Sequence, residues 1–108
     1  MVNNETGVKF KDFIGKTVLF PARGGSYVIE KLTATKIEVR EEKPDEHGTY
    51  AHCVFESGTG PRDNAITRGS LVFVDESLKQ PFVEVYEAYR NSADGRMESY
   101  LEYMGKWD

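Results

Sequence analysis

The chain has 108 residues, of which 39% are hydrophobic and 30% are charged, with a formal net charge of −4 and one cysteine. This composition predicts a single soluble domain over residues 1–108, without an internal disulfide. The longest apolar runs are too short for a membrane span, so we expect no membrane association. Net acidity argues against a protein that coats nucleic acid, because such domains are usually basic.

The charge is unevenly distributed along the chain. Residues 1–40 contain seven Lys/Arg and four Asp/Glu, whereas residues 41–108 contain seven and fourteen. An acidic C-terminal part is typical of a solvated surface, and also of a protein that binds a basic partner. The polar N-terminus lacks the basic and then apolar order of a signal peptide, so we expect a cytoplasmic protein.

The first half of the chain predicts a short helical turn followed by strands. Residues 1–9 are expected to be a loose lead-in, and the helical spacing at 10–14 ends at Gly15. Five runs rich in β-branched and aromatic residues then predict strands. These runs are 16–20, 26–32, 36–42, 50–56 and 71–74.

The apolar positions of these strands predict the core. In the cleanest run, Ile37 and Val39 lie on one face and charged residues lie on the other. Cys53 lies within an apolar pattern and is interpreted as a small buried hydrophobe. The predicted core consists of Val18, Phe20, Ile29, Ile37, Val39, Val54, Leu71 and Phe73.

The C-terminal third is ambiguous. Residues 81–90 fit either a helix that begins at Pro81 or a strand. Residues 96–104 favour an amphipathic helix, with Glu98 and Glu102 opposite its apolar side. The competing structure is a hairpin that turns at Asp94-Gly95. We therefore predict an α+β fold, a small antiparallel β-sheet or SH3-like barrel of about five strands with a C-terminal helix.

The long connection at 57–70 is the first candidate for a binding site. It contains three glycines and several polar side chains, and compact domains rarely carry such a loop unless it binds something or is mobile. We expect it to be more mobile than the flanking strands. Its candidate binding residues are Arg62, Asp63, Asn64 and Arg68.

Aromatic residues among acids form the second candidate. Tyrosine and tryptophan are common at interfaces because they bury a large area at a low entropy cost. The alternative is that these rings fill the core. The candidates are Tyr86, Tyr89, Tyr100, Tyr103 and Trp107.

Catalytic and metal-binding motifs are not recognisable. His52 and Glu56 share a strand face but lie about 13 Å apart along the strand, too far to hold one ion. Gly58-x-Gly60 lacks the lysine that a phosphate loop requires. We therefore expect no cofactor, no metal and no catalytic residue, although a small hydrolase or transferase at the loop, with Arg62, Asp63 and His52, stays an alternative.

The leading hypothesis is a non-enzymatic protein-interaction module, a regulator or inhibitor that binds a protein partner. The sequence does not determine its oligomeric state. A second hypothesis is a nucleic-acid-binding barrel, in which an arginine in the 20–27 turn stacks on bases beside neighbouring lysines. The residues of that alternative are Lys16, Arg23, Lys31, Lys36 and Arg40.

Overall fold

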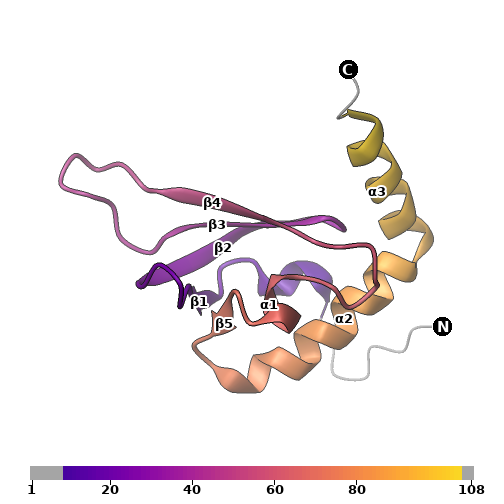
Figure 1. Cartoon of the computed structure of the whole chain (residues 1–108), viewed down its shortest axis with the longest axis horizontal. Coiled ribbons are helices and arrows are strands. Elements are labelled where there is room, and N and C mark those ends of the chain that lie inside the picture. Colours follow the sequence, from indigo (N-terminus) through magenta and orange to yellow (C-terminus); the bar gives the residue numbers. More distant parts are fainter. Residues whose placement is uncertain (1–8, 106–108) are drawn as a thin grey trace.

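The computed structural model describes residues 9–105 and shows an α+β fold (Figure 1). Five strands form one antiparallel sheet in the order β4-β3-β2-β1-β5. The strands are β1 (Thr17–Leu19), β2 (Ser26–Leu32), β3 (Lys36–Glu41), β4 (His52–Glu56) and β5 (Val72–Phe73). The predicted sheet of about five strands is confirmed. The lead-in at 1–9 lies outside the described residues apart from Lys9.

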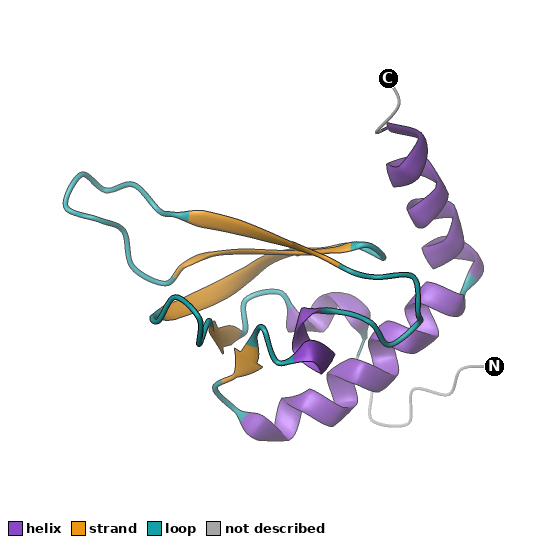
Figure 2. Cartoon of the chain, in the orientation of Figure 1, coloured by secondary structure: helices purple, strands orange, loops and turns teal. Residues whose placement is uncertain are grey.

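The helices lie along one side of the sheet and at one end of it (Figure 2). They are η1 (Phe10–Phe13), α1 (Ala65–Arg68), η2 (Glu76–Leu78), α2 (Lys79–Asn91) and α3 (Ala93–Gly105). The helical turn expected at 10–14 is the 3₁₀ helix η1. Residues 81–90 are helical, so the strand alternative for them is wrong.

The SH3-like barrel is not confirmed, because the sheet is open across the described residues. β4 and β5 form its two edges and do not pair with each other. Side chains partly close one end, where the Phe20 ring after β1 contacts the Phe55 ring of β4 edge-on at 5.1 Å. Packed side chains, rather than a closed hydrogen-bond ladder, therefore enclose this end of the core.

The core lies between the sheet and helices η1, α1 and α2. Phe82 of α2 is fully buried and contacts the rings of Phe13 and Phe73 at 5.0 and 5.4 Å. Phe20 is half-buried against this cluster. The core prediction is confirmed for Val18, Ile29, Ile37, Val39, Leu71 and Phe73, all of which are buried.

Val54 was wrongly predicted to be a core residue, since 55% of its surface is exposed. Side chains alternate across a strand, so one face of β4 carries Cys53 and Phe55 and the other carries Val54. Cys53 and Phe55 pack against the core, and Cys53 is half-buried rather than fully buried. The apolar run 53–55 does not reveal which of its two faces is inside.

Two further expectations are corrected. The hairpin alternative at Asp94-Gly95 is wrong, because both residues lie in the first turn of α3. The connection 57–70 contains a short helix, α1, whose Ala65 and Ile66 are buried in the core. Asn64 caps α1 by accepting hydrogen bonds from the backbone N–H groups of Ile66 and Thr67, at 2.9 and 3.1 Å.

Candidate functional site

Helix α3 leaves the body of the protein at a sharp corner after α2. Ser92 directly follows α2, and its Oγ accepts a hydrogen bond from the backbone N–H of Gly95 at 3.0 Å, which caps α3. A Cβ atom at Gly95 would lie 1.8 Å from the backbone oxygen of Tyr89. The corner therefore requires glycine at this position, and it directs α3 away from α2 (Figure 1).

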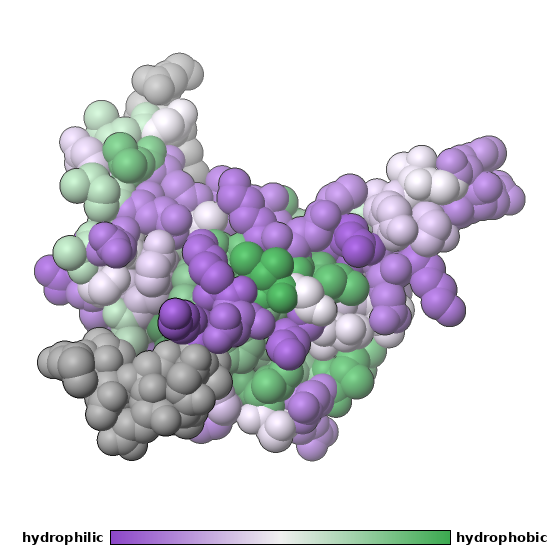
Figure 3. Space-filling model, turned by 180° about the vertical axis from the view of Figure 1, so that it is seen from behind, coloured by the Kyte–Doolittle hydropathy of each residue, from purple (hydrophilic) through white to green (hydrophobic). Residues whose placement is uncertain are grey.

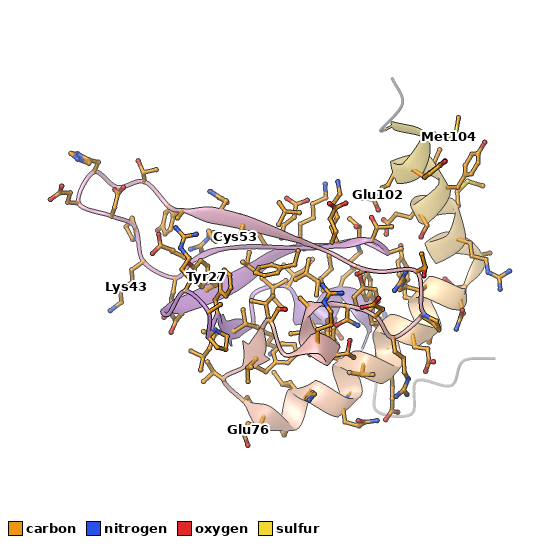
Figure 4. All side chains as sticks on the ribbon, viewed as in Figure 1. Tyr27, Lys43, Cys53, Glu76, Glu102 and Met104 are labelled. Carbon is orange, nitrogen blue, oxygen red and sulfur yellow. The ribbon has the colours of Figure 1, made fainter. Side chains whose placement is uncertain are left out.

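Two carboxylates hold α3 against the turn between β2 and β3. Oε1 of Glu98 accepts a hydrogen bond from the backbone N–H of Ala34 at 2.6 Å. Glu102 accepts hydrogen bonds from the hydroxyls of Thr33 and Thr35 at 3.2 and 2.8 Å. Figure 4 shows Glu102 on the side of α3 that faces the sheet. The acidic side of the amphipathic helix is thus the side that faces the protein.

The apolar side of α3 faces away from the protein. Met97, Tyr100 and Leu101 are 58%, 58% and 60% exposed, and Met104 is 45% exposed. Figure 3 shows green, hydrophobic side chains gathered over α3 at the upper left of the view. Gly95 alone is buried among the residues of α3, all of which lie in the described part of the chain. We call the side chains of Met97, Tyr100, Leu101 and Met104 the outer face of α3.

A shallow groove runs between the outer face and the acidic side of α3. It has a volume of about 410 Å³ and is lined by Tyr89, Asp94, Met97, Glu98, Leu101 and Glu102. The hydroxyl of Tyr89 donates to Oε1 of Glu98 at 3.1 Å. Burial, together with the charge of Glu98, raises the pKa of Tyr89 to about 12. The groove therefore has apolar walls beside three carboxylates and a neutral phenol.

The candidate tyrosines divide between the core and the surface. Tyr86 is fully buried, and its hydroxyl contacts Oγ of Ser57 at 2.5 Å. Tyr89 is half-buried and stacks on Phe10 at 4.2 Å. Tyr100 and Tyr103 on α3 are both 58% exposed. Trp107 lies outside the described residues.

The candidate charged residues of the loop contact other parts of the chain. Arg62 forms an ion pair with Glu87 of α2 at 3.1 Å, and Arg68 forms one with Asp63 at 2.7 Å. Nη2 of Arg68 also donates to the backbone oxygen of Glu56 at 3.0 Å. These side chains therefore pair with other groups of the same chain and do not surround an open pocket.

Arg90 organises this loop, although the sequence did not indicate it as a site residue. From α2, its guanidinium donates to the backbone oxygens of Gly58 and Gly60, both at 2.6 Å, and of Asp63 at 3.3 Å. An arginine presents five donors in a fixed planar arrangement, so it can hold several carbonyls at once. No local pattern indicates this role, because the carbonyls lie about thirty residues earlier in the chain.

Basic residues of the nucleic-acid alternative are partly paired with acids. Nζ of Lys36 lies 3.8 Å from Glu102, and Arg40 lies 3.6 Å from Glu30. The guanidinium of Arg23 contacts Sγ of Cys53 at 3.3 Å. Lys16 and Lys31 are exposed. Pairing with acids weakens the local positive charge that binding to phosphates requires.

Within residues 9–105, no group of three or more His, Cys, Asp or Glu side chains could hold a metal ion. None of the helices in that range is long and apolar enough to cross a membrane. His52 is exposed and lies 3.1 Å from Glu30, so it is on the outer face of the sheet.

No protein-family model, no curated protein and no solved structure matches this chain.

Proposed function

We propose that this protein is a protein-binding module and that the outer face of α3 is its binding surface. The observation that carries the proposal is the orientation of α3, which turns its carboxylates inward and its Met, Leu and Tyr side chains to solvent. Amphipathic helices of globular domains normally bury their apolar side. A contiguous exposed apolar surface is typical of an interaction site.

The stability of α3 supports the same proposal. Isolated helices shorter than about 12–15 residues are marginal in water, and helices in proteins are stabilised mainly by packing of an apolar face. α3 has 13 residues, and its large apolar side chains are all exposed. A partner that covers the outer face would supply the missing burial.

The proposed surface includes Tyr100 and excludes Tyr86 and the two arginines of the 57–70 connection. The ring of Tyr86 is enclosed in the core, and Arg62 and Arg68 contact Glu87 and Asp63. A small domain that binds through one exposed helix would act on its partner as a regulator or inhibitor. Nucleic-acid binding has less support, because two of its five basic candidates are paired with acids.

Affinity capture with the tagged full chain tests the proposal. Leu101→Ser should abolish capture of proteins from an extract of the source organism, because it removes an apolar contact at the centre of the outer face. Val54→Ser is the matched control, since Val54 is similarly exposed but lies on the sheet. Both variants should keep the wild-type melting temperature. Equal capture by Leu101→Ser and the wild type would contradict the proposal.

A further inference from the structure

The chemistry of the groove beside the outer face restricts what can cover it. Its lining contains the apolar side chains of Met97 and Leu101 and three carboxylates, but no basic side chain. Two lysines lie nearby: Nζ of Lys36 is 3.8 Å from Glu102, and Nζ of Lys11 is 5.7 Å from the ring centroid of Tyr89. A segment that enters this groove therefore meets a hydrophobic strip with negative charge along one side.

The carboxylates follow one line along the helix. Asp94, Glu98 and Glu102 are spaced by four residues, so they lie one above another on the same side. Like charges at this spacing destabilise a helix. Glu98 and Glu102 are compensated by the hydrogen bonds to the β2–β3 turn. Within residues 9–105, the carboxylate of Asp94 makes no hydrogen bond or ion pair, and its charge acts on the Tyr89 phenol.

We infer that the partner of α3 is an amphipathic segment whose apolar stripe is bordered by lysines or arginines. This inference rests on the proposed function and specifies the chemistry of the occupant. The apolar stripe packs on the outer face, and the basic side chains lie in the groove with their methylene stems on Met97 and their charged ends toward Asp94. A guanidinium is the better match because its planar donors pair with a carboxylate in two bonds.

Two other occupants fit the charges less well. A second copy of this chain would place one acidic surface beside another, since residues 41–108 carry seven Lys/Arg against fourteen Asp/Glu. A lipid surface attracts helices with Lys and Arg on their polar side, whereas the described residues of α3 include three acids and Arg96 as their one base. Charge complementarity therefore favours a basic protein segment.

Selection from a displayed library of random helical peptides, with the full chain as bait, tests the inference. Peptides whose binding is lost with Leu101→Ser are the ones that use the outer face. These peptides should be enriched in Lys and Arg beside their apolar positions. Enrichment in acidic or neutral residues would overturn the inference and leave the proposed function standing. If Leu101→Ser affects the binding of none of the selected peptides, both the inference and the proposed function are overturned.

Charge variants then test the basic contact directly with one selected peptide. Asp94→Asn should weaken binding by about two- to fivefold, the range of an exposed ion pair, and the loss should shrink at high salt. Glu76→Gln is the control, because Glu76 lies far from α3 (Figure 4) and should leave binding unchanged. Equal affinities for Asp94→Asn and the wild type would overturn the inference.

Two further measurements test a second copy of the chain and a lipid surface as the occupant. Sedimentation of the free chain should show a monomer, and co-sedimentation with vesicles of anionic and neutral phospholipids should show no binding. A dimer that dissociates in Leu101→Ser would make a second copy the occupant and overturn the inference. Vesicle binding that Leu101→Ser abolishes would overturn it in favour of a lipid surface.

Discussion

Glu98 on α3 accepts a hydrogen bond from the backbone N–H of Ala34, 64 residues earlier in the chain, at 2.6 Å. This bond, with those of Glu102 to the same turn, sets the rotation of α3 about its own axis. Because the acidic side is fixed inward, the apolar side is exposed. The orientation of the proposed binding surface therefore depends on two carboxylates.

Glu98→Ala should loosen α3 without unfolding the sheet. A hydrogen bond to a charged group contributes about 1.5–3 kcal/mol when buried, and this part-exposed one should contribute about 1 kcal/mol. Hydrogen exchange should become faster in α3 and stay unchanged in β2 and β3. Glu84→Ala on the exposed side of α2 is the control and should change neither region. Unchanged exchange in α3 would show that Glu98 does not hold the helix.

Gly95→Ala should destabilise the protein by about 1–3 kcal/mol, the usual cost of overpacking. The added Cβ would meet the backbone oxygen of Tyr89, which cannot move aside as a flexible side chain can. Gly105→Ala is the matched control on the same helix, because a Cβ there meets no atom within 4 Å. Urea denaturation measures both variants. Equal stability of the two variants would show that the corner between α2 and α3 does not depend on the close approach of Gly95 to Tyr89.

Arg90→Ala should release the loop between β4 and α1. Its three carbonyl acceptors lose their donor, so the amides of residues 58–64 should exchange faster, and stability should fall by about 1–3 kcal/mol. Arg62→Ala removes only an exposed ion pair with Glu87 and should cost less than about 1 kcal/mol. A larger loss for Arg62→Ala than for Arg90→Ala would reverse these roles.

Ile37→Ala should cost about 2–5 kcal/mol, because Ile37 is fully buried. Val54→Ala should stay within about 0.5 kcal/mol, since its side chain lies on the exposed face of β4. Thermal melts of the two variants compare them directly. Similar losses would mean that the two faces of the sheet are assigned wrongly.

Ionisation of Tyr89 should make the folded state less stable at high pH. The pKa of this phenol is raised from 10.0 to about 12, so the folded state holds its proton more tightly than the unfolded state does. That contribution is present below pH 10 and is lost as the pH rises towards about 12. Tyr89→Phe should therefore flatten the fall of the melting temperature between these values. An unchanged fall would contradict the raised pKa.

The strands and their core could be predicted from local pattern. Apolar and charged residues alternate around Ile37 and Val39, which indicates a strand with one buried and one exposed face. Both residues are buried in the structure. The same reasoning failed at Val54, because three successive apolar residues do not distinguish the two faces. The sequence predicts Asn64 as a binding residue, but in the structure it caps α1, a role that polar side chains of this type often have.

Sequence spacing determined that 96–104 would be a helix with an acidic and an apolar side, because both signals repeat within a few residues. Which side faces the protein was decided only by the tertiary structure. The donors that capture Glu98 and Glu102 belong to the turn at residues 33–35, and the corner that places α3 beside this turn depends on the close approach of Gly95 to Tyr89. Contacts between residues so far apart in the chain leave no periodic trace in the sequence.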